Sequence, residues 1–282
     1  MNMPRGKRDR VFCLIDKDGF GLEIGPSYSP YAPKSQGYAV EIVDHLDTDS
    51  LRKKYNYNPR IEEVDYVFDG RSLVEAIGSK ERYDWIIASH VIEHVPDVIA
   101  FLQDCEALLK PEGVLSLVVP DKRFCFDRFR PHTDASVAID AHFEGRKRPS
   151  PGAVAAGLLY NVFNGGKHSF SAESWAEFQV RFTAEQAKRA MHAARNEYKD
   201  CHVWCFTPAS FRLLLLDLKC LGFTSLQEAT LFPTDTNGSD FIVLLKKSET
   251  QGPSREQLMA DLEDDLRGGL VIPAIFGNQQ RA

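Results

Sequence analysis

The sequence has no apolar run near the roughly 18 residues that a membrane-spanning helix needs, so we expect no membrane span. Its basic start, residues 1–10, is followed only by the short apolar run 11–15, which is too short for a secretory signal. An excess of basic residues is also lacking, because 34 Lys and Arg stand against 40 Asp and Glu, for a net charge of −6. A nucleic acid would gain no general electrostatic attraction from this chain, and we expect no nucleic-acid partner.

Paired cysteines are lacking too. The six cysteines are scattered along the 282 residues without a CxxC pair, which disfavours both a zinc site and a disulfide framework. Four histidines in the middle of the chain have no metal-ligand spacing among them, namely His132, His142, His168 and His192. We therefore expect no metal, and the unpaired thiols fit a cytoplasmic location, where the environment is reducing.

The sequence does contain an alternation of short apolar runs and helical patterns. Its hydrophobic share of 43% and charged share of 26% are those of an ordinary globular protein. The runs 85–88 and 114–119 are typical of strands buried on both faces, and residues 96–109 have helical spacing between them. This order predicts an α/β protein with a Rossmann-like, mostly parallel sheet. A polar turn between 225–232 and 240–246 predicts that the last strand is antiparallel.

The other elements are arranged around the stretch from Phe20 to Pro30. Its apolar run carries Glu23 and stops at Gly25-Pro26, where Gly25 lets the backbone turn sharply and approach a ligand. A second strand, residues 38–43, ends in Asp44. An acid at this position can accept hydrogen bonds from a ribose diol, so the pattern indicates a ligand outside the carboxyl ends of the strands.

Four blocks resemble motifs of class I S-adenosylmethionine-dependent methyltransferases, in that family's order within residues 20–120. They are Glu23-Ile24-Gly25-Pro26, Asp44, Tyr83 to His94, and Leu108 to Leu115. The resemblance implies S-adenosyl-L-methionine as cofactor, with Asp69 at the adenine and Ser89 and His90 at the methionine end. The full set of residues implied at the cofactor is Glu23, Gly25, Pro26, Asp44, Asp69, Ser89 and His90.

The sequence departs from that family in the loop, where Gly25 stands without the one or two further glycines that are usual. A dinucleotide site needs a second glycine for close approach to the pyrophosphate, so the loop disfavours an NAD-dependent sugar enzyme. Together with the lack of an obvious base, the missing glycines leave open another alternative to the enzyme. This alternative is a non-catalytic, regulatory protein of the same fold that binds S-adenosylmethionine.

A helical insertion is expected after the fifth strand, at residues 121–200, before the chain returns to a family-like helix at Thr207-Pro208. We expect this insert to be a lid that binds the acceptor. It would separate the cofactor-binding first part of the core, 1–120, from the end of the core, 201–248, with 249–282 as a tail. The pattern resembles methyltransferases found with bacterial surface-polysaccharide glycosyltransferases, which implies a glycan or another small molecule as acceptor, with a sugar hydroxyl preferred.

A hydroxyl acceptor needs a base, because its pKa lies far above 7. Asp121 follows the fifth strand and His202 precedes the return to the core, so both are expected at the cofactor edge and are the predicted catalytic residues. His202 is the more natural base near pH 7. For His94, a structural hydrogen bond and a catalytic role both stay open.

Local patterns make further predictions outside the central strands. Residues 1–10 are expected to be disordered, and the prolines of 26–37 predict a loop or a short helix in place of a long first helix. Asp49-Ser50 is expected to cap a brief helix, and residues 61–68 to form a third strand. Further helices are predicted at residues 71–77, 151–163, 171–182, 184–198 and 256–266, from their caps and apolar spacing.

Overall fold

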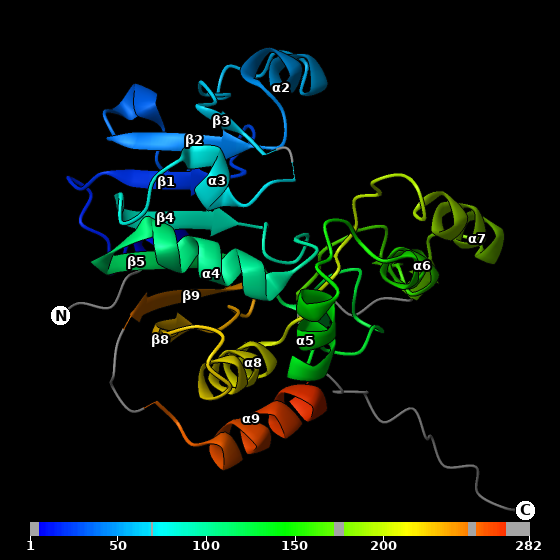
Figure 1. Ribbon diagram of the computed structural model, residues 1–282. Coiled ribbons are helices and arrows are strands. Elements are labelled where there is room, and N and C mark those ends of the chain that lie inside the picture. The colour runs from blue at the N-terminus through cyan, green and yellow to red at the C-terminus, as the bar shows by residue number, and fades with distance from the viewer. Residues whose placement is uncertain (1–5, 69, 172–177, 248–251, 269–282) are drawn as a thin grey trace, which may run out of the picture.

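The computed structural model describes residues 6–68, 70–171, 178–247 and 252–268. Within them, seven strands form one sheet in the order β3-β2-β1-β4-β5-β9-β8 (Figure 1). The strands from β3 to β5 are parallel, and β9 is antiparallel to both β5 and β8, which confirms the predicted fold class. The strands are β1 Gly21–Ile24, β2 Val40–Asp44, β3 Tyr66–Val67, β4 Tyr83–Ser89, β5 Leu109–Pro120, β8 Leu226–Phe232 and β9 Asp240–Lys247.

The helices include one group between β5 and β8 that forms the predicted insertion and the return to the core. The α-helices are α1 Lys7–Val11, α2 Thr48–Lys54, α3 Leu73–Ile77, α4 Val98–Leu108, α5 Ala135–Phe143, α6 Pro151–Leu159, α7 Ala184–Ala193, α8 Pro208–Cys220 and α9 Arg255–Gly268. Two short 3-10 helices are η1 Lys34–Gln36 and η2 Lys122–Phe124. In the part of the chain that the structure describes, no helix combines the length and the apolar character needed to cross a membrane.

Alternate side chains of the central strands enter two apolar cores, one on each face of the sheet. Ile86 and Ala88 of β4 pack with residues of α3, α4 and α8, whereas Trp85 and Ile87 belong to a second cluster on the other face. Burial on both faces explains why β4 and β5 appear in the sequence as continuous apolar runs. The carboxyl ends of β1, β4 and β5 therefore lie at one edge, facing the insert (Figure 1).

The second face is covered by the N-terminal segment. Phe12, directly after α1, packs its ring against the rings of Tyr38 and Trp85, with centroid distances of 5.6 and 6.4 Å. Gly21 of β1 makes room for this packing, because a Cβ atom there would lie 2.1 Å from the Trp85 ring. The predicted disorder of residues 1–10 is thus wrong for the described residues 6–10. They help to cover a sheet face on which the loop 26–37 forms only η1, as predicted.

The insert contains α5, α6, α7 and a separate two-stranded sheet of β6, Val162–Asn164, and β7, Phe178–Val180. The predicted helix 151–163 ends at Leu159, because the backbone groups of residues 162–164 pair with β7 and do not continue the helix. Strand β7 also contradicts the predicted helix 171–182, of which residues 172–177 lie outside the described part. Helix α7 begins at the predicted capping box of Thr183 but ends at Ala193, before residue 198.

Two smaller corrections concern the region after β2. The cap of α2 is Asp47, whose carboxylate accepts from Ser50 N, and not the predicted Asp49-Ser50 pair. The third strand is shorter than predicted, because the side chain of Asp65 accepts the Ile42 N–H and the regular ladder starts only at Tyr66. The predicted helix closed by Gly78 and the amphipathic helix of the tail are both present, as α3 and α9.

Candidate functional site

The predicted site residues gather at the carboxyl edge of the parallel strands, where a Rossmann-like sheet binds its ligands. The insert returns to this edge through residues 200–206. Val203 N donates to Glu93 O at 2.6 Å, and Lys122 N donates to Phe206 O at 2.8 Å. These backbone bonds tie the turns after β4 and β5 to the chain segment that carries His202. Asp69 lies outside the described residues.

The loop after β1 is shaped by Gly25, which has a left-handed φ of +64°. Its N–H donates to Val43 O at 2.8 Å, and a Cβ atom there would lie 3.0 Å from Val91 Cγ2. The loop therefore runs directly against the turn that follows β4. A side chain at position 25 would meet both backbone strain and crowding, which is the requirement that the sequence predicts for a close approach to a ligand.

Asp44 lies at the tip of β2, as predicted, but its carboxylate faces the loop. Oδ2 accepts from Ser27 N at 2.9 Å, and Oδ1 accepts from His45 N at 2.7 Å and lies 2.6 Å from His45 Nδ1. The side chain is fully buried. The acid thus positions Ser27, whose φ of +48° is also left-handed, and it still has acceptor capacity for a ribose hydroxyl.

The carboxylate of Glu23 is hydrogen-bonded to the backbone of the loop that follows β1. Its two carboxylate oxygens accept from Tyr31 N at 2.6 Å and Ala32 N at 2.9 Å, and the residue is buried. Burial raises the pKa of Glu23 to about 7, although these two backbone hydrogen bonds lower it. Of the two roles left open by the sequence, the contacts favour holding the loop. A direct role at the cofactor stays a prediction, as it does for Pro26.

Ser89 and His90 end β4 at the predicted place. His90 has a left-handed φ of +54° and directs its ring toward two acids, with Nε2 3.4 Å from Asp240 Oδ2 and Nδ1 3.5 Å from Glu93 Oε1. Burial lowers the pKa of His90, but these two carboxylates outweigh it and raise the pKa to about 9. The His90 ring therefore lies between two carboxylates, beside the expected methionine end of the cofactor.

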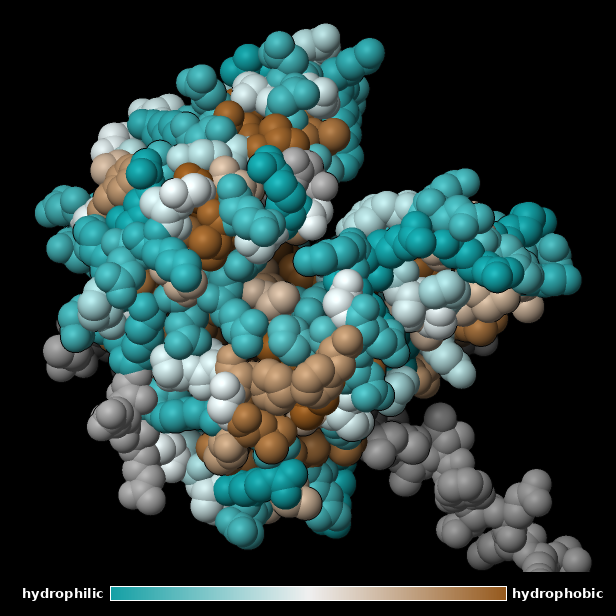
Figure 2. Space-filling view, in the orientation of Figure 1, coloured by the Kyte–Doolittle hydropathy of each residue, from teal (hydrophilic) through white to brown (hydrophobic). Residues whose placement is uncertain are grey.

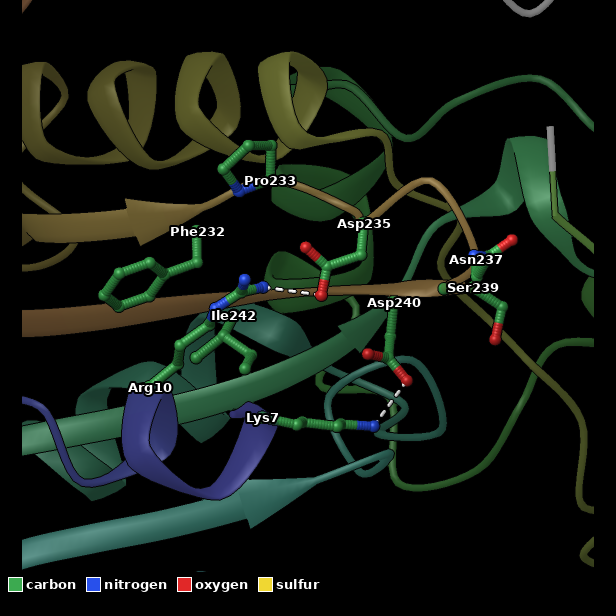
Figure 3. A pocket seen from close by; sticks show the side chains of 10 residues that line it. Lys7, Arg10, Phe232, Pro233, Asp235, Asn237, Ser239, Asp240 and Ile242 are labelled. Atoms are coloured by element: carbon green, nitrogen blue, oxygen red, sulfur yellow. Dashed lines mark hydrogen bonds and ion pairs between the residues drawn. The ribbon is translucent and has the colours of Figure 1, made fainter. Parts of the chain in front are cut away.

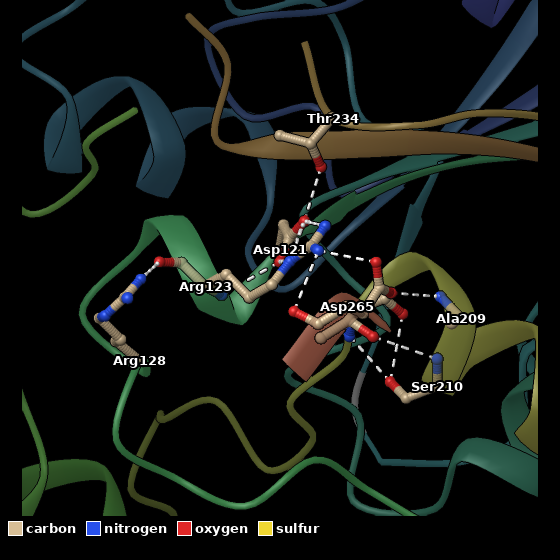
Figure 4. A network of polar contacts seen from close by, with 8 residues as sticks. Asp121, Arg123, Arg128, Ala209, Ser210, Thr234 and Asp265 are labelled. Carbon is tan, nitrogen blue, oxygen red and sulfur yellow. Dashed lines mark hydrogen bonds and ion pairs between the residues drawn. The ribbon is translucent and has the colours of Figure 1, made fainter. Parts of the chain in front are cut away.

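Asp121 is enclosed in an ion-pair network that links the core to the tail (Figure 4). Its buried carboxylate accepts from Arg123 Nη2 at 2.6 Å, from Arg123 Nε at 2.9 Å and from Thr234 Oγ1 at 2.8 Å. Arg123 also binds Asp265 of α9, which in turn accepts from Ala209 N at the start of α8. These contacts disfavour Asp121 as the base and make it a residue that holds η2, α8 and α9 together.

His202, the other predicted catalytic residue, is held by an acid that the sequence reasoning missed. Its Nδ1 donates to Asp127 Oδ2 at 2.5 Å, and Asp127 is paired in turn with Arg130 at 2.9 Å. Burial raises the pKa of Asp127, but His202 and Arg130 together lower it below its ordinary value. With Nδ1 engaged, Nε2 of His202 is the atom left for chemistry, and it points toward Glu93 Oε1 at 3.9 Å.

Glu93 and His94 complete a cluster with His202 that was not predicted as a site. Glu93 and His94 belong to the block Tyr83 to His94, but nothing in the sequence pattern indicated that Glu93 would be fully buried beside three imidazoles. Among the described residues, ligand atoms of Glu93, His94 and His202 lie within 4.8 Å of one another. Three separate segments supply the Glu93, Asp127 and His202 side chains, so only the folded chain brings them together.

Three hollows in the surface can be compared with the position of the predicted site. Figure 2 shows the molecule hollowed between the part with α2 and β3 and the arm formed by α6 and α7, next to the carboxyl edge. A smaller cavity of about 190 Å³ lies between α1 and the start of β9, where Lys7 binds Asp240 at 2.6 Å (Figure 3). A wider hollow of about 880 Å³, lined by Lys80, Phe223 and Lys247, is at the opposite edge and remote from the predicted site.

Comparison with known proteins agrees with the resemblance. A family model described as a methyltransferase domain matches residues 7–218. The chain is similar to a ubiquinone biosynthesis O-methyltransferase of Rhodopseudomonas palustris (strain TIE-1), with 54% identity over 43 residues, which are 15% of this chain and 17% of that protein. A protein of the same description from Bradyrhizobium diazoefficiens is 50% identical over 44 residues, 16% and 17% of the two chains. The chain thus matches less than a fifth of the length of these relatives.

Solved structures with a similar course of the chain have low sequence identity. The CcbJ methyltransferase from Streptomyces caelestis is 11% identical, with 86% of this chain and 97% of that chain covered and a TM-score of 0.45. An S-adenosylmethionine-dependent methyltransferase from Mesorhizobium loti is 11% identical, with 85% and 98% covered and a TM-score of 0.43.

Proposed function

This chain belongs to the methyltransferase domain family, and we propose that it is an S-adenosylmethionine-dependent methyltransferase that methylates a hydroxyl group of a small acceptor. A sugar hydroxyl is the preferred acceptor class. The acceptor would lie between the turn after β4 and the insert, and the cofactor would lie along the loop after β1.

The residues at the edge fit this cofactor. Gly25 offers backbone without a Cβ atom, and the buried acid Asp44 lies where a ribose diol would be held. A Cβ atom at position 25 would lie 3.0 Å from Val91 Cγ2, so this loop runs close to the turn that leads to Glu93. A methyl group carried by the cofactor's methionine end near Ser89 and His90 would then face the cluster of Glu93, His94 and His202.

The chemistry is an in-line displacement. The acceptor oxygen attacks the methyl carbon, the carbon–sulfur bond breaks, and its electron pair stays on sulfur, which becomes a neutral thioether. Alignment of donor and acceptor with exclusion of water can lower the activation free energy by roughly 7–11 kcal/mol. The hydroxyl proton must also leave, because the oxygen is a poor nucleophile while it is protonated.

The single observation that carries the choice of a hydroxyl is the His202–Asp127 pair. Asp127 fixes the imidazole so that Nε2 points toward the interior of the cluster. An amine acceptor that is already neutral would need no such group, whereas a hydroxyl needs help with its proton. The short stretch shared with proteins described as O-methyltransferases also supports oxygen as the acceptor atom.

The preference for a sugar rests on the resemblance described above and on the composition of the insert. The ring of Phe126 lies 4.6 Å from the ring of His202, and His168 contacts Phe163 at 4.5 Å between centroids. Aromatic rings beside a few oriented polar groups are typical of sites for small polar ligands. We infer that the insert binds the acceptor, while the motifs at the cofactor lie outside it.

The test is transfer of a labelled methyl group from S-adenosylmethionine to three acceptor classes, namely sugars or sugar nucleotides, phenols, and primary amines. We expect label in a hydroxyl-bearing acceptor, as a methyl ether, and none in the amines. Phe178→Ala in β7 serves as the matched insert variant, because its ring packs on Phe129 and Phe170 of the insert. It should lower transfer and keep the affinity for S-adenosylhomocysteine.

Two outcomes would contradict the proposal. Tight binding of S-adenosylmethionine without transfer to any hydroxyl would favour the regulatory alternative, and label found only in the amines would exclude oxygen as the acceptor atom. If Phe178→Ala lost cofactor binding while it stayed folded, the division between a cofactor edge and an acceptor insert would be wrong.

A further inference from the structure

Glu93 is a buried carboxylate that faces three imidazoles without a hydrogen bond to any of them. It is fully buried, and neither of its oxygens has a hydrogen-bond partner among the described residues. A carboxylate removed from water in this way is costly unless it is paired or binds a cation. The groups that face it are imidazole nitrogens: His90 Nδ1 at 3.5 Å, and the Nε2 atoms of His94 and His202 at 3.9 Å each.

Two of these imidazoles are oriented from behind by carboxylates. His94 Nδ1 donates to Asp200 Oδ1 at 2.8 Å, and His202 Nδ1 donates to Asp127 Oδ2 at 2.5 Å. Because a carboxylate only accepts, Nδ1 is the donor in both rings, and Nε2 is the nitrogen turned toward Glu93 and available to a cation. A carboxylate–imidazole pair that presents the other nitrogen is the usual arrangement behind a metal-ligating histidine.

The cluster is also held in place by its backbone. Val203 N and Trp204 N both donate to Glu93 O, at 2.6 and 3.2 Å, so the segment after His202 is fixed to the turn that carries Glu93. Arg130 donates to His202 O at 2.7 Å and pairs with Asp127, which prevents the imidazole from rotating away. Ligands on such a supported frame keep their geometry without an ion, as a prepared site requires.

The separations suit a small cation. The ligand atoms of Glu93, His94 and His202 lie within 4.8 Å of one another. A cation bound at about 2.0–2.2 Å needs ligands roughly 3–3.6 Å apart, so each side chain has to move by well under 1 Å. His94 and His90 keep part of their side chains exposed, which leaves a path for the ion from solvent.

We propose that Glu93, His94 and His202 bind a divalent first-row transition-metal cation. Two imidazoles with one carboxylate favour zinc, manganese, iron or cobalt over magnesium or calcium, which prefer oxygen ligands alone. Three protein ligands leave at least one position open. The role of that position rests on the proposed function: it would take the acceptor hydroxyl and acidify it, so that its proton passes to water as the oxygen attacks the methyl carbon. With the ion bound, His202 Nε2 is a ligand, and it helps with the hydroxyl proton through the ion and not by accepting the proton itself.

The sequence predicted no metal because the ligands do not form a short motif. Glu93 and His94 are adjacent after β4, and the third ligand comes from the far end of the insert. His90 is the other group that faces Glu93, but its Nε2 is directed to Asp240 at 3.4 Å. It therefore belongs to the rim of the cluster in this structure.

The test is calorimetry and visible absorption with Co²⁺, Zn²⁺ and Mn²⁺ added to the full chain after removal of metals by a chelator. We expect one cation per chain and, with Co²⁺, an absorption band that reports nitrogen ligands. Glu93→Gln keeps the shape of the side chain and should weaken binding roughly 100-fold or more. Asp200→Asn, which removes the charge behind His94, should weaken it by about 10–100-fold.

His192→Gln is the matched control, because this exposed histidine of α7 is not one of the three proposed ligands, and the variant should bind Co²⁺ like the wild type. Thermal unfolding and the affinity for S-adenosylhomocysteine check that each variant is folded. Equal Co²⁺ affinity in Glu93→Gln and wild type, or no binding below millimolar concentrations, would overturn the metal site. Binding at the cluster in a protein that methylates only amines would support the site and overturn the hydroxyl acceptor.

Discussion

Replacement of Asp44 by Asn tests where the cofactor is held. The carboxylate uses separate oxygens for Ser27 N and for His45 N, at 2.9 and 2.7 Å. An amide has one acceptor oxygen, so one of these buried N–H groups would face an NH₂ group and lose its partner. Such a loss costs about 1–3 kcal/mol of the free energy of unfolding, and thermal unfolding should register it.

The affinity for the cofactor should fall for a second reason. A hydrogen bond from a ribose hydroxyl to an ionised carboxylate is worth about 1.5–3 kcal/mol, so we expect binding to weaken roughly 10- to 150-fold. Calorimetry with S-adenosylhomocysteine measures this directly. Asp49→Asn is the matched control, because it makes the same change of charge on an almost fully exposed side chain of α2, and its affinity should stay that of the wild type. Unchanged affinity in a folded Asp44→Asn protein would refute the placement of the ribose at the tip of β2.

Four further changes test other parts of the account. Gly25→Ala should lower both stability, by about 1–2 kcal/mol for a left-handed residue with a Cβ atom, and cofactor affinity; a variant that binds as tightly as wild type would show that position 25 does not approach the ligand. Because burial raises the folded pKa of Glu23 from 4.5 to about 7, the contribution of Glu23 to stability should be full below pH 4.5 and fall by up to ~3 kcal/mol as the pH rises through 7; the difference in urea unfolding between wild type and Glu23→Gln should show this slope, and a difference that does not change with pH would contradict it. His202→Ala should reduce turnover by about 10²–10⁴-fold with cofactor affinity kept, and a wild-type rate would remove His202 from the reaction. Asp121→Asn should mainly lower the midpoint of unfolding, since its carboxylate binds Arg123, and it should have little effect on the turnover number. A large fall in turnover at unchanged stability would restore the predicted catalytic role.

The central sheet could be predicted from the sequence because its signals are local. Continuous apolar runs such as residues 85–88 occur only where both faces are covered, and Gly25 and Asp44 mark strand ends by their own chemistry. The same local reasoning found the start of the helix predicted at 151–163 but not its end at Leu159, and it was wrong for residues 178–180 of the helix predicted at 171–182, which form β7. There, pairing of β6 with β7 decides the structure, and strand pairing between distant segments leaves little trace in either segment alone.

The site divides in the same way. The edge that carries the predicted residues followed from the order of strands, and Gly25, Asp44, Ser89 and His90 lie on it. The partners of these residues did not follow, because they depend on how distant segments fold together. Glu23 could be a cofactor ligand by sequence, and only the structure places Tyr31 N and Ala32 N on its carboxylate.

His202 and Asp121 show the limit most clearly. Both were placed at the correct edge by the same topological argument, yet one points its free nitrogen into a cluster and the other is enclosed by Arg123 and Thr234. Nothing in the sequence distinguished Asp127, which orients His202, from the other acids of residues 121–200. The environment of a side chain, and not its position along the strand order, separates these roles.

The most direct test of the central claim is methyl transfer from ¹³C-methyl-labelled S-adenosylmethionine to a hydroxyl acceptor, followed by NMR of the product. We expect a labelled methyl ether with wild-type protein. We expect loss of that product, with unchanged affinity for S-adenosylhomocysteine, when His202 is replaced by Ala. Label on nitrogen or carbon, or an undiminished yield of the ether from the His202→Ala protein, would contradict the proposed methylation of a hydroxyl.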